Sequence, residues 1–246
     1  MTDTTNPAGG PTVVLVHGAF ADAGSWSQVT QRLVAAGVPV RAIVNPLRGV
    51  AADSAYVASA ISQTPGPVLA VGHSYGGAVI TNACTRTDNV VGLVYVAAFA
   101  PDEGEQLGEL VGGSQDSILI RAVQETRYPT GDGSESAAEL SIDPARFREV
   151  FTADLPQLQS DVLAVSQRPI AASTFGEKSG PPAWRNLPTW AAVGTADKAA
   201  GSDIVRSMAQ RAQADITEID GSHVIMISRP EAVTDVILKA LKAVSG

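Results

Sequence analysis

Sulfur and imidazole groups, from which many structural metal sites are built, are scarce in this chain. It contains one cysteine, Cys84, and three histidines among 246 residues. A single thiol can form neither an internal disulfide nor a thiolate metal cluster, so we expect no metal site and no bound cofactor. Cys84 falls within an apolar helical pattern, and we interpret it as a small buried hydrophobic residue.

Positive charge and long apolar runs are also lacking. The chain has 17 Lys and Arg residues against 25 Asp and Glu residues, a net charge of -8. This balance repels phosphate backbones and anionic membrane surfaces, which argues against nucleic acid and membranes as partners. No apolar run approaches the ~20 residues of a membrane helix, and residues 1–10 are polar, without the apolar core of a secretory signal. We predict a flexible tail over residues 1–10 and a cytoplasmic protein.

Hydrophobic residues make up 45% of the chain, which is enough for the core of one domain over residues 11–246. Runs of strand length, rich in Val, Ile and Leu, alternate with helical patterns. Such strands are typical of a parallel sheet covered on both faces. The sequence therefore predicts an α/β fold with a doubly wound, six-stranded parallel sheet flanked by helices. The predicted strands are Thr12–Val16, Val38–Val44, Pro67–Val71, Val90–Val96, Leu187–Val193 and Asp215–Ile219; the predicted helices are Ser25–Ala36, Asp53–Ser62, Gly77–Arg86, Ile204–Ala214 and Pro230–Val244.

The alternation stops between about residues 101 and 184, where the sequence is polar and irregular. An insertion this long between two sheet strands is seldom a structureless loop, so we predict a helical cap over the sheet edge. Its helical patterns cover Pro144–Phe151 and Gln157–Ser166, and Gly112–Gly133 is expected to be its mobile part. The residues expected to hold the cap to the sheet are Phe147, Phe151, Leu155, Leu158 and Leu163.

The most informative motif is Gly72-His-Ser-Tyr-Gly76, which follows an apolar strand and precedes a helical pattern. A serine on so sharp a turn requires a strained backbone, and glycines on both sides make that geometry possible. The turn would expose the Ser74 hydroxyl at the carboxyl edge of the sheet. We predict that Ser74 is a catalytic nucleophile.

A serine nucleophile needs a base, and the base needs an acid to orient it. His223 follows the last predicted strand on a glycine-bearing loop, at the same sheet edge as Ser74. Asp197 follows the fifth predicted strand at that edge, so it is our preferred acid. Asp203 and Asp102 remain alternatives, because either could reach the same histidine.

Acyl transfer also needs N–H donors for the developing oxyanion. We assign these to the backbone of Tyr75, directly after the nucleophile, and of Ala19, on the loop after the first strand. The residues expected to line the substrate pocket are Phe20, Trp26, Tyr75, Phe99 and Val224, which are mostly apolar.

Four motifs occur in order along the chain: His17-Gly-Ala-Phe, Gly72-His-Ser-Tyr-Gly-Gly, Gly194-Thr-Ala-Asp and Gly221-Ser-His. Together they resemble the α/β-hydrolase superfamily over essentially the whole chain. The branch most similar is the small one that holds plant methylesterases, hydroxynitrile lyases and many bacterial relatives. The resemblance implies a six-stranded sheet, a helical cap and ester-directed chemistry, and it does not name a substrate.

Three positions depart from relatives in that superfamily. Hydroxynitrile lyases of this branch carry a lysine after the catalytic histidine and a threonine after the first-strand histidine, where this chain has Val224 and Gly18. Because a cation there would serve a cyanide leaving group, its absence favours an esterase. After Asp197, Lys198-Ala-Ala-Gly-Ser replaces the more usual Ile-Pro-Pro-like sequence.

These observations predict a cofactor-free serine hydrolase, a carboxylesterase, that cleaves a neutral, moderately hydrophobic small-molecule ester through an acyl-enzyme. Two alternatives stay open. One is a non-hydrolytic enzyme at the same site, such as a lyase, an acyltransferase or a perhydrolase. The other is a catalytically silent ligand-binding relative.

Overall fold

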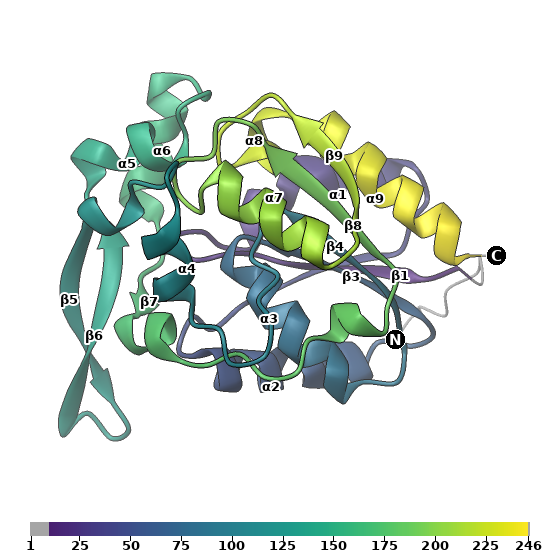
Figure 1. Ribbon diagram of the computed structural model, residues 1–246, viewed down its shortest axis with the longest axis horizontal. Coiled ribbons are helices and arrows are strands. Elements are labelled where there is room, and N and C mark those ends of the chain that lie inside the picture. Colours follow the sequence, from purple (N-terminus) through teal and green to yellow (C-terminus); the bar gives the residue numbers. More distant parts are fainter. Residues whose placement is uncertain (1–9, 246) are drawn as a thin grey trace, which may run out of the picture.

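The computed structural model describes residues 10–245 (Figure 1). Apart from Gly10, the tail predicted for residues 1–10 lies outside the described residues. Between residues 10 and 245, no helix combines the length and the hydropathy that a bilayer-spanning segment requires.

Six parallel strands form the central sheet, in the order β2-β1-β3-β4-β8-β9. All residues of β1, β3 and β8 are buried, as their continuous apolar sequences require. The predicted doubly wound parallel sheet is confirmed. The strands are β1 (Thr12–Val16), β2 (Val40–Ile43), β3 (Val68–His73), β4 (Val90–Val96), β8 (Thr189–Gly194) and β9 (Asp215–Ile219).

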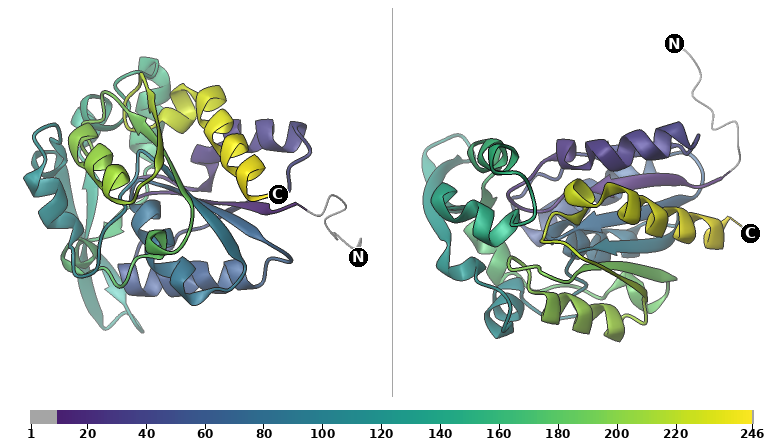
Figure 2. Two further views of the ribbon diagram at one scale, coloured as in Figure 1. Left: turned by 45° about the vertical axis from the view of Figure 1, so that its right-hand side comes forward. Right: turned by 90° about the horizontal axis from the view of Figure 1, so that it is seen from above.

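Helices cover both faces of this sheet (Figure 2). Helices α1 and α9 pack together on one face, and α2 and α3 pack together on the other. Three helices begin earlier than predicted: α2 starts at Val50, after Gly49, α3 starts directly after Ser74, and α7 starts at Ser202. The elements are η1 (Ala23–Trp26), α1 (Ser27–Ala35), α2 (Val50–Ser62), α3 (Tyr75–Ala83), η2 (Cys84–Arg86), α7 (Ser202–Arg211), α8 (Ile225–Ser228) and α9 (Pro230–Val244), where η denotes a 3-10 helix.

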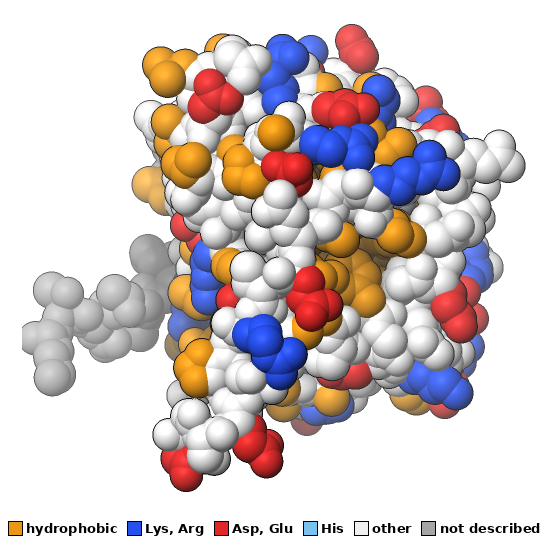
Figure 3. Space-filling view, turned by 90° about the vertical axis from the view of Figure 1, so that its left-hand side faces the viewer, with side chains coloured by type: hydrophobic (Ala, Val, Ile, Leu, Met, Phe, Trp, Pro, Cys, Tyr) orange, Lys and Arg blue, Asp and Glu red, His pale blue; other side chains and the backbone are white. Residues whose placement is uncertain are grey.

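The insertion lies at the carboxyl ends of the sheet strands, on the left in Figure 1. It is not the purely helical cap that the sequence predicted, because β5, β6 and β7 form a three-stranded antiparallel sheet. Figure 3 views the insertion face, where hydrophobic side chains surround a hollow beside the projecting β5–β6 hairpin. The elements are α4 (Leu107–Gly113), η3 (Leu119–Arg121), β5 (Val123–Thr130), β6 (Glu135–Ile142), α5 (Pro144–Phe151), α6 (Gln157–Ser166), β7 (Ile170–Ala171), η4 (Ala172–Gly176) and η5 (Ala183–Arg185).

The hairpin escaped the sequence analysis because neither of its faces is strongly apolar. Strands β5 and β6 pair over their whole length, from Val123 opposite Ile142 to Thr130 opposite Glu135, yet most of their residues are exposed or half-buried. Without a buried face, the strands lack the alternation of apolar and polar residues that identifies a strand. Backbone hydrogen bonds between β5 and β6 therefore stabilise a segment that the sequence predicted to be irregular.

One residue on helix α6 that was predicted to hold the cap to the sheet is exposed instead. Leu158 is 77% exposed, together with Val162 and Val165 on the outer face of the helix. Ser160 and Ala164 are buried on the inner face. The other predicted anchors, Phe147, Phe151, Leu155 and Leu163, are buried or half-buried in the core.

Two histidines belong to the core. His17 and His73 have no exposed surface. His17 Nε2 accepts the N–H of Asn45 at 2.9 Å, which ties the end of β1 to the loop after β2. Burial lowers the pKa of His17 from 6.5 to about 4, and burial lowers the pKa of His73 well below its ordinary value. Both imidazoles are therefore neutral in the folded protein at neutral pH.

We predict that the folded state loses stability as the pH falls below the ordinary histidine value of 6.5. The unfolded chain binds protons at residues 17 and 73 that the folded chain cannot bind until a much lower pH. From its pKa shift, His17 alone accounts for about 2 kcal/mol between about pH 7 and pH 5. Urea denaturation at the two pH values should show a smaller difference in His17→Gln than in wild type. An equal difference in both proteins would contradict this assignment.

Backbone contacts fix how the loop after β1 meets the turn after β3. The ends of these strands are paired, with Val16 opposite Gly72. A Cβ atom at Gly76 would lie only 2.4 Å from the carbonyl oxygen of Val16, and a Cβ atom at Gly18 would lie 2.6 Å from Cβ of Ser74. Only glycine fits at either position without moving the backbone.

The Gly76→Ala variant should lose about 3 kcal/mol or more of folding stability, because the clash is with backbone that cannot rotate away. Gly113, at the end of α4, is the matched control, since a Cβ atom there meets nothing within 4 Å. Gly113→Ala should stay within about 1 kcal/mol of wild type. Chemical denaturation of the two variants tests this expectation, and equal stabilities would refute it.

Candidate active site

Ser74 occupies a strained turn between β3 and α3. Its backbone has φ 52° and ψ −124°, an unfavourable conformation for a residue with a side chain. Its carbonyl oxygen accepts the N–H groups of Gly77 at 2.9 Å and Phe99 at 3.2 Å, which hold the turn in place. The side chain is mostly buried, and its hydroxyl has no hydrogen-bond partner among residues 10–245. The expected nucleophile turn is thus present in its strained form.

His223 and Asp197 form a buried pair. His223 Nδ1 donates to Asp197 Oδ2 at 2.7 Å, and each side chain is only 1% exposed. The other carboxylate oxygen accepts the N–H groups of Ala199 at 2.8 Å and Ala200 at 3.0 Å. Prolines at these two positions would provide no N–H, so the departure from the usual superfamily sequence supports the carboxylate directly. The arrangement fixes the tautomer that leaves Nε2 free to accept a proton.

The two rival acids have other partners. Asp203 accepts hydrogen bonds from the Ser114 hydroxyl and from the Gln115 N–H. Asp102 forms an ion pair with Arg185. Among the described residues, neither carboxylate contacts His223, and the structure therefore favours the pairing with Asp197.

The loop that carries His223 is held from two sides. His73 Nε2 lies 3.1 Å from the carbonyl oxygen of His223, and the two ring centroids are 4.7 Å apart. From the insertion, the Phe151 ring packs 4.9 Å from the His223 ring. The Ser222 hydroxyl contacts the Phe151 carbonyl at 3.3 Å and the Asp154 carboxylate. The base loop is thus in contact with both the serine turn and the insertion.

No site role was predicted for His73, and Phe151 was predicted only to hold the cap to the sheet. The contact of His73 with the histidine loop joins residues 150 positions apart, so no local pattern could reveal it. Phe151 had a weak signal, since Phe147 and Phe151 share one face of a helical pattern, four residues apart.

Two backbone N–H groups, those of Ala19 and Tyr75, have no acceptor among the described residues. The neighbouring N–H of Phe20 is already bonded to the Arg168 carbonyl at 3.2 Å, and Phe20 itself has φ 60°. The two free donors are those that the sequence assigned to an oxyanion hole.

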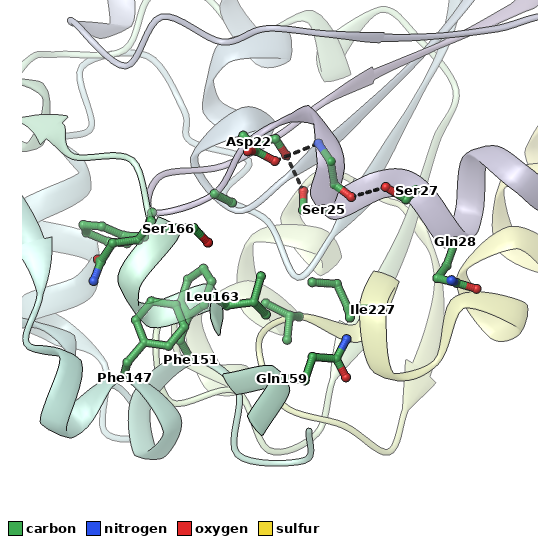
Figure 4. Close-up of a pocket in the computed structure, with 15 residues that line it drawn as sticks. Asp22, Ser25, Ser27, Gln28, Phe147, Phe151, Gln159, Leu163, Ser166 and Ile227 are labelled. Carbon is green, nitrogen blue, oxygen red and sulfur yellow. Dashed lines mark hydrogen bonds between the residues drawn. The ribbon is translucent and has the colours of Figure 1, made fainter. Parts of the chain in front are cut away.

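A cavity of about 220 Å³ lies between η1, α5, α6 and the loop after His223 (Figure 4). Phe20 and Val224, two of the residues predicted for the substrate pocket, line this cavity, and the aromatic rings of Phe147 and Phe151 form another part of its wall. Phe151 also packs against the His223 ring, so one residue of the cavity wall is in contact with His223. The remaining lining residues are Ala21, Asp22, Gly24, Ser25, Ser27, Gln28, Gln159, Leu163, Ser166, Gln167 and Ile227.

Three other residues predicted for the pocket do not line this cavity: Trp26, Tyr75 and Phe99. Trp26 is fully buried, and its ring packs edge-on against His73 with centroids 6.3 Å apart. Phe99 is 4% exposed and supports the turn through its backbone. The side chains of Trp26 and Phe99 belong to the core beneath the site. Over residues 10–245, no three His, Cys, Asp or Glu side chains come together as a metal site.

Comparisons with known proteins agree with this architecture. Three solved structures are similar over nearly the whole chain: a pyrethroid hydrolase from Sphingobium faniae JZ-2 (20% identity, 95% of this chain and 98% of that one, TM-score 0.77), polyneuridine aldehyde esterase (19%, 94% and 99%, 0.79) and a methylesterase from Arabidopsis (21%, 94% and 99%, 0.76). At these identities the likeness shows the fold. No curated protein sequence matches this chain significantly.

The sequence profile of the alpha/beta hydrolase family matches residues 13–236, which include the turn, the acid loop and the histidine loop. The resemblance inferred from the four motifs is confirmed, and with it the assignment of the chain to the hydrolases. The chain belongs to the alpha/beta hydrolase family.

Proposed function

We propose that the protein is a serine carboxylesterase in which Ser74, His223 and Asp197 form the catalytic triad. The observation that carries the proposal is the buried 2.7 Å hydrogen bond between His223 and Asp197, on a loop packed against the strained turn of Ser74. No other pair of an imidazole and a carboxylate within residues 10–245 is joined in this way.

Acylation begins with attack of Ser74 Oγ on the ester carbonyl carbon, while His223 Nε2 takes the hydroxyl proton. Asp197 stabilises the resulting imidazolium. The tetrahedral oxyanion accepts hydrogen bonds from the N–H groups of Ala19 and Tyr75. Each such hydrogen bond commonly stabilises the transition state by about 3 kcal/mol. The imidazolium then gives its proton to the alkoxide, and the alcohol leaves.

Deacylation uses the same groups in reverse order. His223 Nε2 takes a proton from water, whose oxygen attacks the acyl carbon bound to Ser74. A second oxyanion forms against the same two N–H groups and collapses, and the proton on His223 returns to Ser74 Oγ as the carboxylic acid leaves. These steps use only side chains, backbone N–H groups and water.

The cavity supports a neutral, moderately hydrophobic ester as substrate. Its wall combines aromatic and aliphatic side chains with the amides of Gln28, Gln159 and Gln167, and the only ionisable lining side chain is that of Asp22. Asp22 already accepts the N–H of Gly24 as the cap of η1. Three structural relatives are a pyrethroid hydrolase, an esterase and a methylesterase, and they support ester cleavage as the reaction class.

Hydrolysis of p-nitrophenyl esters of increasing acyl length tests the proposal. Ser74→Ala and His223→Ala should each abolish turnover and labelling by a fluorophosphonate probe, because triad members act as a unit. Asp197→Asn should stay folded and lose about 10⁴-fold in kcat, because the histidine tautomer is no longer fixed. Asp102→Asn and Asp203→Asn are the matched controls and should retain activity.

Other outcomes would decide for the alternatives. Labelling of Ser74 without hydrolysis of any ester would point to an acyltransferase or another non-hydrolytic activity. A folded wild-type protein that is neither labelled nor active would point to a ligand-binding relative. If activity survives in Asp197→Asn and disappears in Asp102→Asn, the acid of the triad is Asp102 and the assignment of Asp197 is wrong.

We expect the cavity to determine which acyl-chain lengths the protein prefers in its ester substrates. Leu163 lines the cavity, whereas Leu158 on the same helix is 77% exposed. Leu163→Trp fills the cavity, so KM should rise for long acyl chains and stay unchanged for acetyl esters. Leu158→Trp, the matched control, should leave both unchanged. An identical acyl-length profile for Leu163→Trp and wild type would place substrate binding elsewhere.

A further inference from the structure

The side chain of Tyr75 makes a contact that the proposed mechanism does not use. Tyr75 follows the nucleophile and supplies one of the two free N–H groups, while its hydroxyl donates to Asp53 Oδ2 on helix α2 at 2.7 Å. Both side chains are buried: Tyr75 is 2% exposed, and Asp53 has no exposed surface. The first residue of α3 is thus attached to the neighbouring helix by a buried hydrogen bond.

Burial of the Asp53 carboxylate at this position lowers the folding stability of the protein. Among the described residues no lysine or arginine side chain pairs with it, and its other hydrogen bonds come from the backbone N–H groups of Arg48 at 3.1 Å and Gly49 at 3.5 Å. The Arg48 guanidinium instead pairs with Glu139 on β6 at 3.2 Å. Burial raises the pKa of Asp53, and the Tyr75 hydroxyl opposes that rise. A buried carboxylate without a cation lowers stability, so its presence calls for a role.

The geometry of the turn shows what this contact controls. The peptide plane between Ser74 and Tyr75 carries the oxyanion N–H at one end and the Ser74 carbonyl at the other. That carbonyl is held by Gly77 N and Phe99 N. The Tyr75 end of this plane is the first residue of α3, and the hydrogen bond from the Tyr75 hydroxyl to Asp53 attaches that end to α2.

We propose that Asp53 is a positioning residue for catalysis, which acts through the Tyr75 hydroxyl to aim the Tyr75 N–H at the developing oxyanion. The inference rests on the proposed esterase function. Neither Asp53 nor the Tyr75 hydroxyl touches the reacting atoms, so their loss acts on transition-state stabilisation and leaves substrate binding unchanged.

The chain contains a matched control for this contact. Tyr95 on β4 is 1% exposed, and its hydroxyl lies 2.8 Å from the Thr81 hydroxyl, on the same helix α3 that begins with Tyr75. Tyr95→Phe therefore removes a buried tyrosine hydrogen bond to α3 without touching the turn. A loss of activity that results only from lower folding stability should be equal in Tyr95→Phe and Tyr75→Phe.

The test compares wild type, Tyr75→Phe, Asp53→Leu, Asp53→Asn and Tyr95→Phe. Each protein is assayed for Tm, for kcat and KM with p-nitrophenyl butyrate, and for the Ki of an alkyl trifluoromethyl ketone, which forms an oxyanion on Ser74. Tyr75→Phe and Asp53→Leu should lose about tenfold in kcat, a fraction of the loss from removing a donor outright. Their KM should stay within about twofold of wild type, and Ki for the ketone should rise by the same factor as kcat falls.

Asp53→Asn keeps an acceptor oxygen for the Tyr75 hydroxyl and should recover part of the activity lost in Asp53→Leu. Tyr95→Phe should lower Tm and leave kcat and Ki within about twofold of wild type. If wild type hydrolyses esters and Tyr75→Phe behaves like Tyr95→Phe, the positioning role is refuted and the esterase function stands. If Tyr75→Phe does not fold, the two Asp53 variants decide by the same criteria. A folded wild type that neither hydrolyses esters nor binds the ketone would overturn both proposals.

Discussion

The close approach of two backbone segments, the loop after β1 and the turn that carries Ser74, is the constraint on which the site depends. The loop after β1 lies directly against the strained Ser74 turn, at a distance that excludes a Cβ atom on Gly18 or Gly76. That contact in turn requires β1 and β3 to be neighbours in register, which the buried apolar strands provide. Strain of this kind costs about 1–3 kcal/mol, and the buried sheet beneath the turn offsets it. Ala19 and Tyr75, whose N–H groups have no acceptor among the described residues, lie on the two backbone segments that meet in this contact.

The insertion belongs to this site as much as the sheet does. Ile118 N donates to the Lys198 carbonyl at 2.9 Å, and the Ser114 hydroxyl donates to Asp203, so the insertion contacts the loop that carries Asp197. At its other side, Phe151 packs against His223. The loops of Asp197 and of His223 are therefore each in contact with the insertion, in addition to the hydrogen bond between the two side chains. We infer that the alignment of the proposed triad depends on the packing of the insertion, and that the cavity beside Phe151 links substrate binding to the position of the base.

The sequence predicted the parts of the structure that depend on local patterns. Continuous apolar strands identified the sheet, and the Gly-x-Ser-x-Gly motif identified a turn whose backbone is strained as expected. The β5–β6 hairpin was missed because its stability comes from backbone pairing, with no apolar face to leave a pattern. Trp26 and Phe99 were misplaced because an aromatic residue near a motif can equally be core or wall, and only packing decides. Asp53 carried no signal either: a single carboxylate in the first turn of a helix ordinarily faces solvent, and here it lies beneath the serine turn.

The central claim is that Ser74, His223 and the two free N–H groups form one catalytic site. A crystal structure of the protein after reaction with a phosphonate ester tests it most directly, because the phosphonyl group imitates the tetrahedral intermediate. The account predicts phosphorus bonded to Ser74 Oγ, with its phosphonyl oxygen within hydrogen-bond distance of both Ala19 N and Tyr75 N and with His223 Nε2 facing the bridging oxygen. Phosphorus on another side chain, or a phosphonyl oxygen turned away from both N–H groups, would contradict it.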